Sequence, residues 1–252
     1  MLGAEDLNPR PPVLLALPYT LYAATVFLVL SLAVLVALLV LPGLERRRAL
    51  VRAGARLALA LMGQRFQLKH AERLPAGPCV VVANHTSYLD GVVMTAALPA
   101  RFGFVIKREM DAVPLANLLL RRIGAQFVDR GRTQRSARDA RRLLKSAHGA
   151  ASMVFFPEGT FGSKPGLLHF HAGAFVFAVR AALPVVPVAL RGTRRALAPG
   201  GALAWPVRIE IEILDAIALP TAEADVAVPA VRDAARAAIL ARCGEPDRAD
   251  GV

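Results

Sequence analysis

The sequence predicts an α/β domain with a mainly parallel sheet flanked by helices, preceded by an N-terminal hydrophobic helix or helical hairpin that anchors it to a membrane. Between residues 65 and 243, short apolar runs alternate with longer helical patterns, as in layered α/β folds. A stretch without charged residues precedes them, and 55% of all residues are hydrophobic, with a mean hydropathy of +0.46. We therefore divide the chain into an anchor with a basic helix (1–64), a main domain (65–243) and a flexible tail (244–252).

The uncharged stretch runs from Pro11 to Leu44. As one helix it would be roughly 51 Å long at 1.5 Å per residue, whereas the hydrocarbon core of a bilayer is about 30 Å thick. Two arrangements remain open: one tilted span with an interfacial lead-in, or a shallow helical hairpin in one leaflet. A cleaved secretory signal fits less well, because the run is long and the residues before it carry a net charge of −1.

A basic segment follows the uncharged stretch. Residues 45–56, ERRRALVRAGAR, contain five Arg and one Glu. Positive residues beside an apolar segment stay in the cytoplasm, and each attracts anionic lipid by about 1 kcal/mol near the surface. The main domain is therefore predicted on the cytoplasmic side. The two cysteines, Cys79 and Cys243, do not form a disulfide framework, which agrees with a reducing compartment.

The elements of the main domain follow in order. A helix is expected over 49–63, and we expect it to continue through Arg65 to His70. Apolar runs predict strands at 79–83, 102–106, 126–129, 152–156, 185–190 and 207–214. Helical patterns lie near 88–98, 111–123, 133–148, 170–182 and 229–242. The last apolar run, VRIEIEIL, alternates at its centre and is predicted to be an edge or half-exposed strand.

The charge balance limits the kinds of partner. Lys and Arg number 31 against 19 Asp and Glu, a formal net charge of +12. Aromatic residues make up only 6%, and the sequence carries no nucleic-acid readout motif, so we expect no nucleic-acid partner. The predicted helix 133–148 has an apolar stripe and an Arg-rich opposite side. That side is either a solvated face or a surface for anionic lipid or an acidic carrier protein.

A histidine and an aspartate follow the predicted strand 79–83. His85 and Asp90 lie in the run NHTSYLD, at the strand end, where parallel sheets build their sites. Histidine is the usual general base near neutral pH, and a carboxylate bonded to one ring nitrogen leaves the other free to take a proton. A structural histidine that closes the strand is the alternative interpretation.

Two further strand ends carry polar side chains. Glu158, Gly159 and Thr160 follow one apolar run, where a carboxylate beside a glycine could bind a hydroxyl or position a cation. A helix N-cap turn, with Thr160 capping, is the alternative there. Arg130 follows the predicted strand 126–129. The alternative interpretation of Arg130 is a surface ion pair with Asp129.

Four blocks of the sequence, NHTSYLD, GAQFVDR, FPEGT and VPVAL, resemble the blocks of the glycerolipid acyltransferase family in the same order. The family is best known for 1-acylglycerol-3-phosphate acyltransferases. KREM at 107–110 resembles the family's stretch between the first two blocks. The resemblance covers roughly residues 65–215 and favours the catalytic interpretation of His85 over the structural one. It implies that residues 65–243 form an acyltransferase catalytic domain.

The resemblance also implies a mechanism. His85 would deprotonate the free hydroxyl of a lysolipid, and Asp90 would orient His85 and stabilise its charge. The hydroxyl would attack the thioester of acyl-CoA or acyl-carrier protein without forming an acyl-enzyme. With 1-acyl-sn-glycerol-3-phosphate as the acceptor, the product would be phosphatidic acid. The residues implied to bind the acceptor are Lys107 and Arg130 for its phosphate, and Glu158, Gly159 and Thr160 for its glycerol part.

The resemblance implies neither a cofactor nor a metal. His169 and His171 are interpreted as residues of a loop rather than as a metal pair with His85. The implied partners are membrane lipid, a lysolipid acceptor and acyl-CoA or acyl-carrier protein. Together with the basic segment, the resemblance implies an inner (cytoplasmic) membrane location with the catalytic domain on the cytoplasmic side.

One position departs from the family's pattern. The third block usually continues as FPEGTR, with the Arg contacting phosphate, whereas this sequence has Phe161. Either Arg130, Lys107 or Lys164 compensates, or the acceptor is a different lysolipid such as a lyso-aminolipid. A further alternative is a non-catalytic membrane protein that binds anionic lipid through its basic face.

Overall fold

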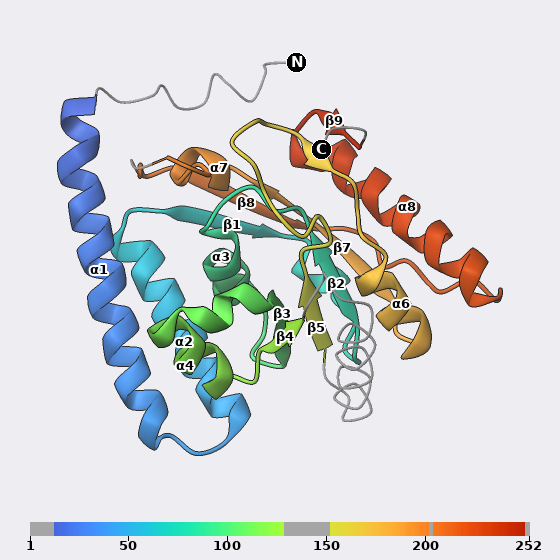
Figure 1. Cartoon of the computed structure of the whole chain (residues 1–252), viewed down its shortest axis with the longest axis horizontal. Helices are drawn as coiled ribbons and strands as arrows, with labels where there is room; N and C mark the ends of the chain where they lie inside the picture. The colour runs from blue at the N-terminus through green and yellow to red at the C-terminus, as the bar shows by residue number, and fades with distance from the viewer. Residues whose placement is uncertain (1–12, 129–151, 202–203, 250–252) are drawn as a thin grey trace.

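The computed structural model describes residues 13–128, 152–201 and 204–249. Its centre is a seven-stranded sheet with the order β1-β8-β7-β2-β5-β3-β4 (Figure 1). Neighbouring strands run parallel, except for the antiparallel pair β7–β8, which confirms the predicted mainly parallel α/β fold. The strands are β1 (Arg65–Lys69), β2 (Val80–Ala83), β3 (Phe102–Lys107), β4 (Gln126–Val128), β5 (Ser152–Phe155), β7 (Val185–Arg191) and β8 (Arg208–Ile213).

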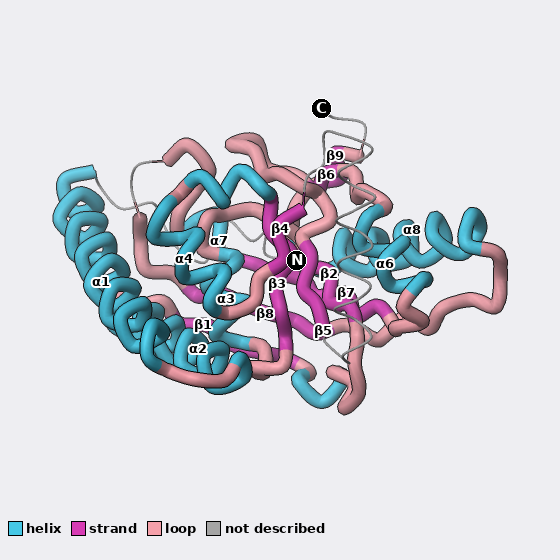
Figure 2. Tube along the Cα trace, turned by 60° about the horizontal axis from the view of Figure 1, so that its bottom comes forward, coloured by secondary structure: helices cyan, strands magenta, loops and turns pink. Residues whose placement is uncertain are grey.

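Helices cover both faces of this sheet. Figure 1 shows α1 to α4 on one side and α6 and α8 on the other. The helices are α1 (Val13–Val40), α2 (Leu44–Leu61), α3 (Asp90–Ala97), α4 (Pro114–Arg122), α6 (Gly173–Arg180), α7 (Thr193–Ala196) and α8 (Ala224–Cys243), with short 3₁₀ turns η1 (Ala71–Arg73) and η2 (Arg108–Ala112). A second, two-stranded sheet pairs β6 (Leu167–Leu168) with β9 (Asp247–Arg248) (Figure 2).

Strand β2 shows why the predicted strands are unbroken apolar runs. All four of its residues are buried. Val81 and Ala83 pack in the core under α2 and α3, whereas Val80 and Val82 pack in the core under α6 and α8. Because helices cover both faces of a central parallel strand, its side chains are apolar on both faces and do not alternate with polar ones.

One expectation about the sheet is wrong, and another holds in one of its two forms. Residues Arg65–Lys69 do not continue α2 but form β1, because Gly63 turns the chain with a φ of 67° and the segment then pairs with β8. Strand β8 was predicted to be an edge or half-exposed strand; it lies between β1 and β7 and is half-exposed. Its isoleucines are buried while its Arg and Glu side chains are at least partly exposed, as the alternating sequence predicted.

Two further expectations concern residues 133–148 and the C-terminal tail. The helix expected at 133–148 lies outside the described residues. The expected flexible tail has defined contacts as far as Ala249, because β9 pairs with β6 and Arg194 Nε donates to Glu245 Oε1 at 2.8 Å. The tail is therefore attached to the loop that contains β6.

Helix α1 is one continuous helix and lies against the domain along most of its length (Figures 1 and 2). Near its start, Tyr19 Oη donates to the carbonyl of Met62 at 2.7 Å. Near its end, Arg122 Nη2 donates to the carbonyl of Leu38 at 2.6 Å. By length and composition, Leu14–Val40 could cross a membrane. Its outer face exposes large apolar side chains, including Leu14, Leu17, Leu21, Leu28, Leu32, Val36 and Leu39.

A glycine allows the close approach of α1 and α2. A Cβ atom built on Gly54 in α2 would lie 2.7 Å from Val34 Cγ2 in α1, which is shorter than carbon atoms tolerate without displacement. Because α2 packs in turn on α3, this contact connects the apolar helix to the sheet domain.

We expect Gly54→Val to destabilise the protein by about 1–3 kcal/mol, the usual cost of overpacking. Thermal unfolding in detergent measures this. Ala53→Val is the matched control, because Ala53 is exposed on the same helix. Equal melting temperatures for the two variants would contradict the proposed packing.

Candidate active site

The loop after β2 lies between two neighbouring strands. Strand β2 pairs with β5 on one side and β7 on the other, and the ends of such strands are where parallel sheets carry their sites. Asn84 is buried and bonds to β7 twice: its Nδ2 donates to the carbonyl of Leu190 at 3.0 Å, and its Oδ1 accepts from the Leu190 N–H at 2.7 Å. This pair fixes where the loop leaves the sheet.

His85 and Asp90 are in direct contact, as their spacing predicted. His85 Nδ1 lies 2.8 Å from Asp90 Oδ2. The same oxygen accepts the backbone N–H groups of Thr86 at 2.6 Å and Ser87 at 2.8 Å. Asp90 is fully buried at the first residue of α3, where the positive end of the helix dipole favours a carboxylate. An ionised Asp90 assigns the proton to Nδ1 and leaves Nε2 as the acceptor.

The loop has two more attachments that the sequence did not reveal. Thr86 Oγ1 is 3.0 Å from Thr193 Oγ1, in α7. Ser87 Oγ donates to the carbonyl of Leu197 at 2.7 Å. Both contacts reach the segment after β7, more than a hundred residues along the chain. The sequence shows two hydroxyl residues beside His85, but it does not show which distant residues they bond to, because that depends on the tertiary fold.

Glu158 lies beside His85 but faces the protein interior. It is 2% exposed, and its Oε1 accepts the backbone N–H of His85 at 2.6 Å while its Oε2 accepts the N–H of Leu168 at 2.8 Å. Both carboxylate oxygens thus contact the protein's own backbone. Burial raises the pKa of Glu158 to about 7, and the two backbone N–H groups oppose the rise only in part.

The neighbours of Glu158 form a turn. Gly159 has a φ of 75°, a region that favours glycine, and its N–H donates to the carbonyl of Phe156 at 3.1 Å. Thr160 is exposed and precedes an irregular segment, so no helix starts there for it to cap. Gly159 and Thr160 therefore lie at the surface side of the turn that holds Glu158.

The two residues implied to bind phosphate are not both described. Lys107 ends β3, which is separated from β2 by β5. Its Nζ lies 3.2 Å from Glu109 Oε1, and its side chain is half-exposed. Arg130 lies outside the described residues.

Two aromatic rings contact the imidazole of His85, and a third extends from one of them. The ring of Phe156 stacks on it with centroids 4.4 Å apart, and the ring of Phe161 lies at 4.1 Å. Tyr88 meets Phe161 edge to face at 5.0 Å. The His85 side chain keeps 19% of its surface exposed. The sequence marked Phe161 as unusual, but it did not indicate that its ring lies on His85.

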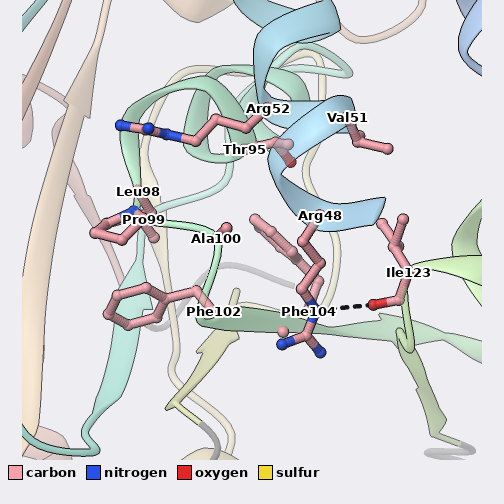
Figure 3. A pocket seen from close by; sticks show the side chains of 11 residues that line it. Arg48, Val51, Arg52, Thr95, Leu98, Pro99, Ala100, Phe102, Phe104 and Ile123 are labelled. Carbon is pink, nitrogen blue, oxygen red and sulfur yellow. Dashed lines mark hydrogen bonds between the residues drawn. The ribbon is translucent and has the colours of Figure 1, made fainter. Parts of the chain in front are cut away.

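A small pocket lies away from this site, between α2, the end of α3 and β3 (Figure 3). Arg48 and Arg52 line it, and Arg48 Nε donates to the carbonyl of Ile123 at 2.9 Å. Its volume of about 20 Å³ has room for about one water molecule. It is therefore too small to hold a lysolipid.

The histidines of the loop after Gly166 do not form a metal site with their described neighbours. The rings of His169 and His171 lie 6.0 Å apart. Within the described ranges, no group of three or more His, Cys, Asp or Glu side chains is arranged to hold a metal ion.

We expect stability to fall as Glu158 ionises. Its pKa rises from 4.5 to about 7 on folding, so the folded state holds the proton more tightly than the unfolded state. This contribution is complete below about pH 4.5 and is lost as the pH rises through 7, by up to about 3 kcal/mol. Denaturant unfolding at pH 5 and pH 8, compared with Glu158→Gln, measures it. If the difference in unfolding free energy between wild type and Glu158→Gln is the same at both pH values, this expectation is wrong.

The chain is similar in sequence to known proteins over this region. A family profile described as Acyltransferase matches residues 65–191. Human 1-acyl-sn-glycerol-3-phosphate acyltransferase beta is 33% identical over 174 residues, 67% of this chain and 62% of that protein. Lyso-ornithine lipid O-acyltransferase of Pseudomonas aeruginosa is 35% identical over 136 residues, 54% of this chain and 50% of that protein. This chain thus spans between half and two thirds of the length of these relatives.

One solved structure is similar over almost the whole described fold. The crystal structure of the 1-acyl-sn-glycerophosphate acyltransferase PlsC from Thermotoga maritima aligns with a TM-score of 0.74 and 21% identity, covering 90% of this chain and 95% of that one. At this identity the likeness establishes the fold alone. The profile match covers half of the sequence and includes His85, Asp90 and Glu158, and on that basis this chain belongs to the Acyltransferase family.

Proposed function

We propose that this chain transfers a fatty acyl group from acyl-CoA or acyl-carrier protein to the free hydroxyl of a lysolipid. The contact between His85 Nδ1 and Asp90 Oδ2 at 2.8 Å, at the end of a central strand in an Acyltransferase-family chain, carries the proposal. Relatives named 1-acyl-sn-glycerol-3-phosphate acyltransferase support that lysolipid as the first candidate acceptor, with phosphatidic acid as the product.

The reaction needs one proton acceptor and no covalent intermediate. His85 Nε2 takes the proton of the acceptor hydroxyl as its oxygen forms a bond to the thioester carbonyl carbon. The carbon–sulfur bond then breaks, and the departing thiolate takes the proton from the imidazolium. Asp90 holds the imidazole in place and stabilises its charge. General-base assistance of this kind contributes about 10²–10⁴-fold to the rate.

The other residues divide into positioning and binding roles. Because both oxygens of Glu158 accept backbone N–H groups, we assign it the positioning of His85 rather than contact with the glycerol part. Lys107 and Arg130 remain the proposed phosphate ligands. Gly159 and Thr160 remain the proposed contacts to the rest of the acceptor headgroup.

A second candidate acceptor is a lyso-aminolipid. The Pseudomonas aeruginosa relative named for lyso-ornithine lipid is 35% identical. Phe161 also lies on His85, where the family's usual pattern would have supplied a cation for phosphate.

We also propose that α1 lies in the cytoplasmic leaflet of the inner membrane rather than across the bilayer. The contacts of Tyr19 and Leu38 with the domain are 19 residues apart, about 28 Å of helix. That length is close to the thickness of the hydrocarbon core, about 30 Å. A spanning α1 would therefore draw the docked domain into the hydrocarbon, whereas a helix parallel to the surface buries only its apolar outer face.

Removing the general base tests the function. We expect His85→Ala to lose about 10²–10⁴-fold of acyl transfer, measured as thiol release from oleoyl-CoA with 1-acyl-sn-glycerol-3-phosphate or a lyso-aminolipid in detergent micelles. His169→Ala is the control, because His169 is exposed outside the site. Undiminished turnover by folded His85→Ala would defeat the assignment.

The role of Glu158 is tested by separating kcat from KM. A Gln side chain would present an NH₂ group to one of the two N–H donors, so His85 would lose its support. We expect Glu158→Gln to lower kcat about tenfold or more with little change in acceptor KM. A raised KM with unchanged kcat would instead indicate that Glu158 contacts the acceptor.

The orientation of α1 is tested by depth measurement. Spin labels on single cysteines at Leu17, Leu28 and Leu39, which are about half-exposed on the outer face, should all report similar shallow depths in liposomes. Cys79 and Cys243 are buried and give little background. A deep label at position 28 between two shallow ones on opposite surfaces would demonstrate a span.

A further inference from the structure

Two segments far apart in the sequence meet at the loop of residues 159–166. Arg194 belongs to α7, and its Nη1 donates to the carbonyl of Gly162 at 2.8 Å. Glu245 lies in the C-terminal tail just after α8, and its Oε2 accepts the N–H of Gly166. The loop is therefore attached at both of these glycines, once to α7 and once to the tail.

An ion pair joins the two attachments. Arg194 Nε donates to Glu245 Oε1 at 2.8 Å, and the two side chains are only 15% and 12% exposed. Each carboxylate oxygen of Glu245 thus has one partner, and Arg194 uses two of its nitrogens. Because bonds on two sides fix the direction of the planar guanidinium, the pair also fixes how far Gly162 lies from Gly166.

Helix α7 connects this loop to the loop after β2, which carries the proposed general base. Thr193 Oγ1 lies 3.0 Å from Thr86 Oγ1, one residue after the histidine. Arg194, the next residue of α7, holds the loop 159–166. The ring of Phe161 in that loop lies 4.1 Å from the imidazole, centroid to centroid. Consecutive residues of one short helix therefore hold the imidazole loop and the loop that covers it.

We propose that Arg194 and Glu245 are positioning residues that hold the loop 159–166 in the shape that receives the acceptor. Gly159 and Thr160, the proposed contacts to the acceptor headgroup, begin this loop. A loop without its two attachments would become ordered only when the acceptor binds, and that ordering reduces affinity. This inference rests on the proposed acyl transfer and gives the C-terminal tail a part in it.

The test separates acceptor binding from turnover, with oleoyl-CoA and whichever of 1-acyl-sn-glycerol-3-phosphate or a lyso-aminolipid wild type uses better. We expect Glu245→Gln to raise the acceptor KM about tenfold, because the loop must be ordered on binding. Its kcat should change less than about twofold, because the contacts of His85 are unaffected. Arg194→Gln should have the same effects. The double variant should be no worse than either single variant, since both side chains act on one loop, and it leaves neither charge without its partner.

Asp247→Asn is the matched control. Asp247 lies in the same tail, but its side chain pairs with Arg236 in α8 rather than with the loop 159–166. We expect this variant to keep both the KM and the kcat of wild type. Hydrogen–deuterium exchange of a peptide that contains Gly166 should be faster in Glu245→Gln and unchanged in Asp247→Asn, whether or not acceptor is present.

Several results would overturn the inference. A lowered kcat with unchanged KM in Glu245→Gln, an equal rise of KM in Asp247→Asn, or additive effects in the double variant would each do so. Unchanged exchange at Gly166 in Glu245→Gln would overturn it too and leave the proposed acyl transfer intact. Transfer by wild type to neither acceptor would overturn the proposed function and the role of the pair in it. Thermal unfolding shows whether each variant is folded.

Discussion

One carboxylate oxygen organises the site. Asp90 Oδ2 accepts the Nδ1–H of His85 and the backbone N–H groups of Thr86 and Ser87. Because a single buried atom holds both the ring and the backbone that carries it, the direction of the imidazole and the shape of the loop are fixed together. Asp90 begins α3, so the helix also fixes the carboxylate relative to the sheet. The position of the imidazole and the local folding of the loop thus depend on the same carboxylate.

The two strands beside β2 also hold the histidine loop in place. Asn84 attaches the start of the loop to β7, and Glu158 attaches the His85 backbone to the segment after β5. These strands pair with β2 on its two sides. The histidine loop is therefore attached to the strands on both sides of β2, which limits the geometric error in the proposed proton transfer. The rings of Phe156 and Phe161 then cover part of the imidazole.

The sequence predicted the parts of the structure that depend on local pattern. Unbroken apolar runs located the central strands, because both faces of those strands are covered. The His85–Asp90 contact was predictable, since a short loop after a strand brings the two residues together. Strand β1 was missed, because RFQLK is mostly polar and follows a helix directly, and its pairing with β8 depends on residues far along the chain. The inward direction of Glu158 and the packing of Phe161 were not predicted for the same reason: both depend on contacts with residues far away in the sequence.

The attachment of β9 to β6 also affects the order in which the protein assembles. Glu158 joins the His85 backbone to Leu168, and Leu168 lies in β6, which pairs with Asp247–Arg248 in β9. During synthesis on the ribosome, α1 emerges before any of these partners and can reach the lipid surface first. The histidine loop acquires its full set of supports only after residues 245–248 have left the ribosome. The proposed membrane helix is therefore synthesised before the contacts that complete the proposed site.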